Sequence, residues 1–122
     1  MKLAVMASGK QGLEAEVDSR FGRAPYFVVV DSESMESSVH KNKAASETGG
    51  AGIAAAQAVL DEGVQGVIAG NFGPKAFEIL NSGEVKLFAL SEVTIKEALE
   101  KFNQGKVEEL SNYTSSAHSG LN

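Results

Sequence analysis

Residues 66–90, GVIAGNFGPKAFEILNSGEVKLFAL, decide the fold class, because their pattern is that of a strand, a helix and a second strand. The apolar runs 66–70 and 85–90 are short enough to be buried strands. Between them, Pro74 stands at a first helical position and Gly83 stands just past the end of the predicted helix. This order favours two parallel strands joined by a helical crossover, and therefore an α/β domain.

Two further helices are predicted on either side of this unit. Residues 47–63, ETGGAGIAAAQAVLDEG, predict a helix that Thr48 or Gly50 caps and Gly63 ends. Its apolar stripe is expected to be Ile53, Ala56, Val59 and Leu60. Residues 94–102, TIKEALEKF, begin with a capping box, in which Thr94 precedes Glu97 by three positions.

Three strands are predicted ahead of the helices. They are KLAVMA (2–7), YFVVVD (26–31) and MESSVHK (35–41), of which the third alternates only weakly. The order β-β-β-α-β-α-β-α predicts a five-stranded mixed sheet with helices packed on its faces. We place in its core Leu3, Val5, Phe27, Val28, Val29, Val67, Ile68 and Leu87. Residues 1–110 are expected to form a single domain, and the Ser- and Asn-rich residues 111–122 a flexible tail.

The composition narrows the classes of function. The 122 residues suit one domain, and a hydrophobic content of 43% is enough for an ordinary core. The formal net charge of −5 argues against a nucleic-acid partner, because duplex affinity rests on cationic contacts to phosphate. The chain has no cysteine, which excludes disulfides, thiolate catalysis and thiolate metal ligands. No apolar run approaches the roughly 20 residues of a membrane span, so we expect no membrane partner and a cytoplasmic location.

The carboxyl ends of the predicted strands indicate where a ligand would bind. Strand 2–7 ends in the long connection 8–25, and long connections in compact domains are usually functional or mobile. If strand 35–41 runs parallel to strand 2–7, the glycines of segment 49–52 reach the same edge of the sheet. Two helix starts with accessible N–H groups would make that edge favour anions. The candidate ligand contacts there are Lys10, Arg20, Arg23, Gly49, Gly50, Gly52, Asn71, Gly73 and Lys75.

The same residue types are also consistent with roles simpler than anion binding. The glycines could serve only as turn residues, and the cations could be solvated. Glu14, Glu16 and Asp18 alternate in the long connection and could face a hard cation, but a solvated loop is the favoured interpretation, since no other oxygen-rich cluster is evident. His40 is a candidate metal contact, but a protein metal site normally needs three or four ligands. The pattern GAGIAA (50–55) lacks the preceding buried strand and the later acid that a dinucleotide site requires.

Five blocks of the sequence carry a resemblance to a known family. They are MASG (6–9), SRFGRAPYFVVVD (19–31), GGAG (49–52), GVIAGNFGPKAFEIL (66–80) and VTIKEALEKFNQGKVEEL (93–110). In this order they resemble the nitrogenase iron–molybdenum cofactor biosynthesis accessory proteins, whose shared unit is a dinitrogenase iron–molybdenum cofactor-binding domain. The resemblance implies a ribonuclease H-like α/β fold, with a five-stranded mixed sheet, an antiparallel second strand and helices on both faces.

The same resemblance implies a function in handling metal–sulfur cofactors. Nitrogenase-linked members bind or carry such anionic cofactors or their precursors, and a stand-alone relative, the orange protein, holds a molybdenum–copper–sulfide cluster without covalent attachment. Nuclease activity is not implied, because strand 2–7 lacks the acids that hold two metal ions in ribonuclease H. Relatives often have histidine directly before the Phe-Gly pair, where this chain has Arg20. An arginine keeps its proton and cannot ligate a metal, whereas its guanidinium suits polyanions.

The residues and the resemblance together predict a small, non-catalytic carrier of an anionic metal–sulfur cluster, of molybdenum or iron–molybdenum type, in cofactor assembly or storage. Its expected partners are proteins that donate or accept the cofactor. The alternative is a regulator that binds a phosphorylated or carboxylated metabolite in the same cleft. A phosphoesterase is a third hypothesis, for which no base–nucleophile pair is visible. A fourth is an interaction module that docks a partner through residues 111–122.

Overall fold

A computed structural model describes residues 1–114 of the chain, and within them six strands form one mixed sheet in the order β3-β2-β1-β4-β5-β6. The strands are β1 (Lys2–Ala7), β2 (Tyr26–Asp31), β3 (Ser37–Lys41), β4 (Gly66–Ala69), β5 (Lys86–Ala89) and β6 (Glu108–Glu109). The helices are α1 (Ala51–Asp61), α2 (Pro74–Ser82) and α3 (Ile95–Asn103), with the 3-10 turns η1 (Gly12–Glu14) and η2 (Lys43–Ser46). None of the helices in this part of the chain has the length and apolar character that crossing a membrane requires.

The central strand β1 fixes the directions of the other strands. It pairs antiparallel with β2, from Lys2 opposite Asp31 to Ala7 opposite Tyr26, and parallel with β4. β3 is antiparallel to β2 and hence parallel to β1, while β5 is parallel to β4. The antiparallel second strand is therefore confirmed, and the condition that the third strand runs parallel to the first is met. The carboxyl ends of β1, β3, β4 and β5 lie at one edge of the sheet, here called the carboxyl edge.

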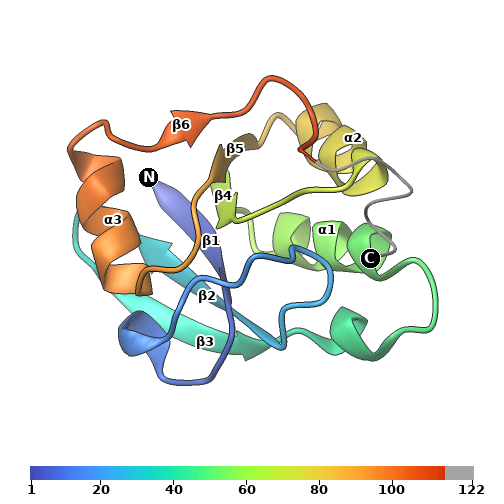
Figure 1. Cartoon of the computed structure of the whole chain (residues 1–122), viewed down its shortest axis with the longest axis horizontal. Coiled ribbons are helices and arrows are strands. Elements are labelled where there is room, and N and C mark those ends of the chain that lie inside the picture. Colours follow the sequence, from blue (N-terminus) through green and yellow to red (C-terminus); the bar gives the residue numbers. More distant parts are fainter. Residues whose placement is uncertain (115–122) are drawn as a thin grey trace.

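Helices cover both faces of the sheet. Successive residues of β1 point to opposite faces, so Ala4 and Met6 join the core beneath α1 and α2, whereas Leu3 and Val5 join the core beneath α3. In Figure 1, α3 accordingly lies on one side of the strands and α1 and α2 lie on the other. All eight residues that the sequence places in the core are buried.

The predicted number of strands is wrong by one. The sixth strand, β6, consists of Glu108 and Glu109 paired antiparallel with Ala89 and Phe88 of β5. Both glutamates are exposed, so no apolar alternation marks this strand in the sequence. The pairing arises because the chain passes beside β5 after α3, where Leu110 N donates to the carbonyl oxygen of Leu87 at 2.8 Å. The ribonuclease H-like class stays a prediction.

Of the two predicted caps of the first long helix, Gly50 is confirmed and Thr48 is not. α1 begins at Ala51, and its N-cap Gly50 has the left-handed conformation, with φ of 73°. Thr48 does not cap the helix, and Ile53 is only half-buried. A threonine cap requires extended backbone at the capping residue, whereas the chain here makes a left-handed turn that glycine accommodates without strain.

The end of the described chain is attached to the molecule. Thr114 N donates to the carbonyl oxygen of Phe72 at 3.1 Å, and Thr114 Oγ1 accepts from Phe72 N at 2.9 Å. Residues 115–122, which make up most of the predicted tail, lie outside the described residues, and so does most of the segment proposed for docking a partner.

Candidate functional site

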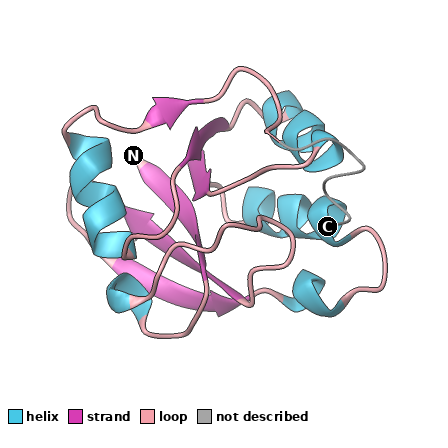
Figure 2. Cartoon of the chain, viewed as in Figure 1, coloured by secondary structure: helices cyan, strands magenta, loops and turns pink. Residues whose placement is uncertain are grey.

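The connection between β1 and β2, residues 8–25, fills the point at the carboxyl edge where β1 and β4 separate. Asp18 N donates to the carbonyl oxygen of Met6 at 2.8 Å, and Gly70 N donates to that of Asp18 at 3.1 Å. Figure 2 shows this connection as a loop apart from the short turn η1. Ligands of parallel α/β sheets usually bind in such a crevice. Here the protein's own backbone occupies it, so a candidate ligand surface has to be sought further out.

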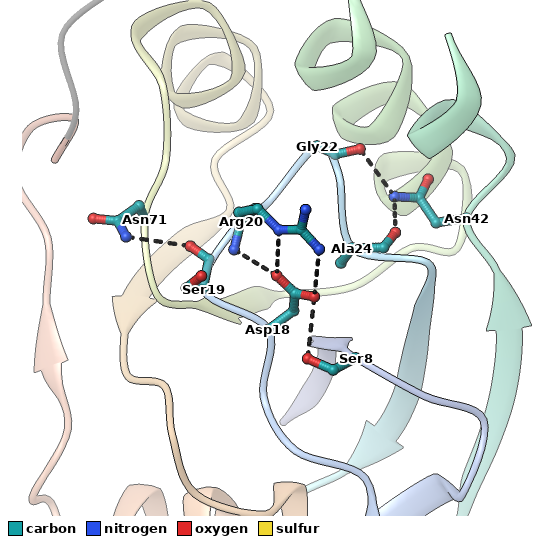
Figure 3. Close-up of polar contacts among 8 residues, drawn as sticks. All are labelled: Ser8, Asp18, Ser19, Arg20, Gly22, Ala24, Asn42 and Asn71. Atoms are coloured by element: carbon teal, nitrogen blue, oxygen red, sulfur yellow. Dashed lines mark hydrogen bonds and ion pairs between the residues drawn. The ribbon is translucent and has the colours of Figure 1, made fainter. Parts of the chain in front are cut away.

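Asp18 is the centre of the polar contacts in this connection (Figure 3). Its carboxylate accepts hydrogen bonds from Arg20 N at 2.8 Å, Arg20 Nε at 3.2 Å, Arg20 Nη2 at 3.3 Å and Ser8 Oγ at 3.1 Å. Burial works to raise the pKa of Asp18. The hydrogen bonds from Arg20, the guanidinium charge and the hydrogen bond from Ser8 together outweigh burial and hold this pKa below its usual value. Asp18 is thus an anion at neutral pH, although its side chain is only 4% exposed.

Arg20 keeps its charge and most of its exposure in this ion pair. The hydrogen bond and the charge of Asp18 raise the pKa of the guanidinium. The Arg20 side chain is 62% exposed, and its Nη1 atom has no hydrogen-bond partner within residues 1–114. Arg20 lines an open cleft of about 250 Å³ whose other lining residues are Ser8, Glu16, Val17, Asp18, Ser19, Ser91 and Glu92. The cleft thus mixes one cation with three carboxylates and does not by itself favour an anion.

Arg23 makes different contacts from Arg20. Its Nη1 atom donates to the carbonyl oxygen of Ala45 at 2.9 Å and to that of Glu47 at 2.6 Å. Asn42, which is almost fully buried, donates through Nδ2 to the carbonyl oxygens of Gly22 at 3.3 Å and Ala24 at 2.8 Å (Figure 3). Both side chains therefore fasten residues 22–24 to the segment that leads into α1.

The first turns of α1 and α2 lie against each other at the carboxyl edge. A Cβ built on Gly52, in the first turn of α1, would lie 3.5 Å from Cβ of Ala76, in the first turn of α2. The N-cap residues are Gly50 and Gly73, and neither helix has a side-chain cap. The first N–H groups of a helix have no partner within it and carry its positive partial charge. Gly49, Gly50 and Gly73 have no atom of the described chain within 4 Å of a built Cβ, so this backbone is open.

The remaining predicted contacts divide between this edge and other places. Asn71 holds the connection beside α2, because its carbonyl oxygen accepts from Phe21 N and its Nδ2 donates to the carbonyl oxygen of Ser19, each at 3.3 Å. Lys75 is exposed in the first turn of α2. Lys10 is exposed in the bend after β1. Neither lysine forms an ion pair within residues 1–114, and no contact brings Lys10 to the helix starts.

His40 lies with the end of α1 and not with its start. Its ring stacks on Phe27, with ring centroids 5.1 Å apart, and its Nε2 atom lies 3.9 Å from Oε1 of Glu62, which follows the last residue of α1. In residues 1–114 there is no group of three or more His, Asp or Glu side chains that could hold a metal ion. The described part of the chain therefore gives no support to a hard-cation site at Glu14, Glu16 and Asp18.

Two residues of the site have roles that the sequence did not predict: Asp18, named only as a possible contact of a hard cation, and Asn42. Asp18 has a local signal, because an aspartate often accepts a hydrogen bond from the backbone two residues later, as Arg20 N provides here. Asn42 has no comparable signal, since its acceptors on Gly22 and Ala24 are far from it in the chain.

Comparison with known proteins places these features in a family. Residues 1–105 match the family model described as dinitrogenase iron–molybdenum cofactor. The apo form of the orange protein from Desulfovibrio gigas is 36% identical and aligns over 93% of this chain and 96% of its own, with a TM-score of 0.89. A NifB-like protein from Thermotoga is 34% identical over 93% of this chain and 97% of its own, with a TM-score of 0.79. An uncharacterized protein of Methanocaldococcus jannaschii is 29% identical over 91 residues, which are 72% of this chain and 77% of that protein.

Proposed function

Since the chain belongs to the dinitrogenase iron–molybdenum cofactor family, we propose that it is a small binding protein that captures an anionic metal–sulfur cluster non-covalently, for cofactor assembly or storage. The cluster is of molybdenum or iron–molybdenum type. The protein acts by binding and release and not by catalysis. Its partners are the proteins that donate the cluster to it or accept the cluster from it.

The observation that carries this proposal is the contact between two uncapped helix starts. A Cβ built on Gly52 of α1 would lie 3.5 Å from Cβ of Ala76 of α2, so the first turns of the two helices pack side by side. Backbone N–H groups at a helix start bind anions without needing a charged side chain. The sulfide and oxide atoms of a metal–sulfur cluster are suitable acceptors for them, and the open glycines leave room for a bulky ligand.

Lys75 would supply positive charge from the first turn of α2, and Arg20 would supply it from the connection 8–25. Arg20 follows Ser19, which Asn71 ties to the loop before α2, and Lys75 lies in the first turn of that helix. Asp18 engages Nε and Nη2 of Arg20, which leaves Nη1 for a ligand. Hydrogen bonds with an ionised partner are roughly twice as strong as neutral ones. Cluster retention therefore rests on charge and hydrogen bonds, without a protein atom bonded to the metal.

The proposal is tested by anaerobic incubation with tetrathiomolybdate, with and without copper, followed by desalting, absorbance and metal analysis. We expect stoichiometric molybdenum in the wild-type protein. Arg20→Ala should weaken binding about tenfold, because it removes charge-assisted hydrogen bonds. Lys86→Ala is the matched control, since Lys86 is an exposed cation at the first residue of β5, at the end of that strand opposite the carboxyl edge. It should leave binding unchanged.

Colourless wild-type protein without stoichiometric metal would count against the proposal. A thermal-shift screen with nucleotides and sugar phosphates runs in parallel. A rise in melting temperature with those compounds, and none with tetrathiomolybdate, would support a metabolite-binding regulator in place of a cluster carrier.

A further inference from the structure

We infer that Arg23 is a positioning residue that fixes the approach to α1, and that Arg20, not Arg23, is the arginine that contacts the ligand. The inference rests on the proposed function and assigns separate tasks to its two arginines. Both arginines stand in the same short loop and both are exposed. Their hydrogen bonds are what distinguish them.

The contacts of Arg23 are with the backbone that precedes α1. A single nitrogen, Nη1, donates to the carbonyl oxygens of Ala45 and Glu47, at 2.9 Å and 2.6 Å. These two residues lie at the end of η2, directly before the open glycines 49 and 50. Holding both carbonyl oxygens fixes the orientation of the peptide groups there.

Asn42 and Gly22 also hold the loop that contains Arg23 against the segment leading into α1. Asn42 Nδ2 donates to the carbonyl oxygens of Gly22 and Ala24, and Asn42 N donates to that of Pro25 at 2.9 Å. Gly22 lies so close to α1 that a built Cβ would be 2.8 Å from Gly52 N. Gly22, Arg23 and Asn42 therefore form a clasp that holds the loop and the start of α1 in one arrangement.

The shape of the Arg23 side chain allows a positioning role of this residue to be distinguished from a purely electrostatic role. A guanidinium is a planar fork whose donors keep fixed directions, whereas a lysine ammonium is a compact charge on a flexible stem. If Arg23 acts through position, lysine cannot replace it. If Arg23 acts through charge, lysine can replace it, and loss of a neighbouring cation should have a similar effect. Lys43 provides that comparison, because it is an exposed cation in η2 and forms no ion pair within residues 1–114.

The experiment measures two quantities in wild type, Arg23→Ala, Arg23→Lys and Lys43→Ala. The first is the dissociation constant for tetrathiomolybdate, and the second is backbone amide exchange of residues 49–53 without ligand. We expect both Arg23 variants to bind about tenfold more weakly and to exchange faster at residues 49–53. Amide exchange in α3 should not change, which separates a local effect from general destabilisation. Lys43→Ala should match wild type in both measurements.

The outcomes separate this inference from the proposed function. Wild-type affinity in Arg23→Lys, or an equal loss of affinity in Lys43→Ala, would mean that Arg23 acts by charge and would overturn the inference. If the wild-type protein binds no tetrathiomolybdate, the proposed function fails, but the amide exchange still decides the role of Arg23. Unchanged exchange of residues 49–53 in Arg23→Ala would then show that Arg23 does not position them.

Discussion

Asp18 and Arg20 determine each other's role. A buried carboxylate is stable only if hydrogen bonds or charges compensate for the water it loses, and Arg20 and Ser8 supply these to Asp18. In return, Asp18 holds the guanidinium at the surface of the carboxyl edge. Arg20 therefore has two roles, as the partner of Asp18 in a structural ion pair and as a candidate ligand contact.

The ion pair predicts how stability depends on pH. The pKa of Asp18 is lowered on folding, so its contribution is complete above its ordinary value of 3.8 and is lost as pH falls below that value. Asp18→Asn should lower the free energy of unfolding at pH 7, and the gap to wild type should narrow in acid. Urea unfolding between pH 7 and pH 3 measures this gap.

Asp31 provides the control for this titration. Hydrogen bonds from the backbone of Ser34 and then Glu33 lower the pKa of Asp31 as well. Asp31→Asn should therefore remove only its own part of the acid dependence and leave that of Asp18. Parallel pH curves for wild type and Asp18→Asn would show that the ion pair contributes nothing to folding.

At the level of elements, the helices of the described chain begin in two different ways. α3 has a complete capping box, in which Thr94 Oγ1 accepts from Glu97 N at 3.1 Å and the Glu97 carboxylate accepts from Thr94 N at 3.2 Å. α1 and α2 begin at glycines without side-chain caps. The capped helix packs on the opposite face of the sheet from α1 and α2, the two helices whose starts have no side-chain cap.

Capping α2 should strengthen the helix and weaken ligand binding. Gly73 already has the extended backbone of an N-cap, with φ of −75° and ψ of 166°, and a Cβ there meets no atom of the described chain within 4 Å. Gly73→Asp should raise the free energy of unfolding by about 0.5 kcal/mol. It should also reduce tetrathiomolybdate retention, because the new carboxylate occupies the N–H groups and repels an anion. Gly73→Ser caps without charge and should reduce retention less; equal retention in all three proteins would contradict the role of α2.

Removing the cap of α3 should lower the stability of the protein without changing ligand binding. Thr94→Ala should cost about 1 kcal/mol of stability, since it deletes an N-cap hydrogen bond. Retention of tetrathiomolybdate should stay at the wild-type level, because α3 lies on the other face of the sheet. Urea unfolding and metal analysis after desalting measure the two effects, and a loss of retention here would mean that stability alone governs binding.

For the molecule as a whole, the insertion of residues 8–25 into the carboxyl edge is the decisive feature. Asp18 bridges the backbones of Met6 and Gly70, and Phe21 packs beneath the edge with its ring centroid 5.3 Å from that of Phe72. The buried residues of the connection are thus part of the core, while Arg20 at its surface is the candidate ligand contact. The proposed ligand surface therefore lies at the starts of α1 and α2 and not in the crevice.

The close packing of this connection predicts the effect of a single methyl group. A Cβ at Gly70 would lie 2.6 Å from Ser19 Cα, which belongs to the backbone and cannot move alone. Gly70→Ala should therefore lower the free energy of unfolding by roughly 1–3 kcal/mol, the usual cost of overpacking. Gly49→Ala is the matched control, because a Cβ there meets no atom of the described chain within 4 Å. Urea unfolding of both variants measures the difference, and equal stability would mean that the connection is not packed against β4.

The sequence predicts well those features that local interactions determine. The strands 2–7 and 26–31, the helix from Pro74 to the residue before Gly83 and the capping box of α3 all depend on neighbouring residues, and all are confirmed. The strand β6 could not be predicted, because its two glutamates pair only through their proximity to β5. The sequence left the cap of α1 open between Thr48 and Gly50, and the left-handed turn at Gly50 decides between them.

For the candidate site, the sequence alone determined which residue types are available: open glycines before two helices, two arginines and no cysteine. Only the tertiary structure decided their tasks. Arg20 pairs with Asp18, two residues away, whereas Arg23 donates to the carbonyl oxygens of Ala45 and Glu47. A backbone hydrogen bond from Gly70 to Asp18 holds the connection in the crevice. The physical reason is that a hydrogen bond acts over about 3 Å in space, whatever the distance along the chain. Local periodicity therefore specifies helices and strands, whereas the partners of a side chain depend on how those elements pack.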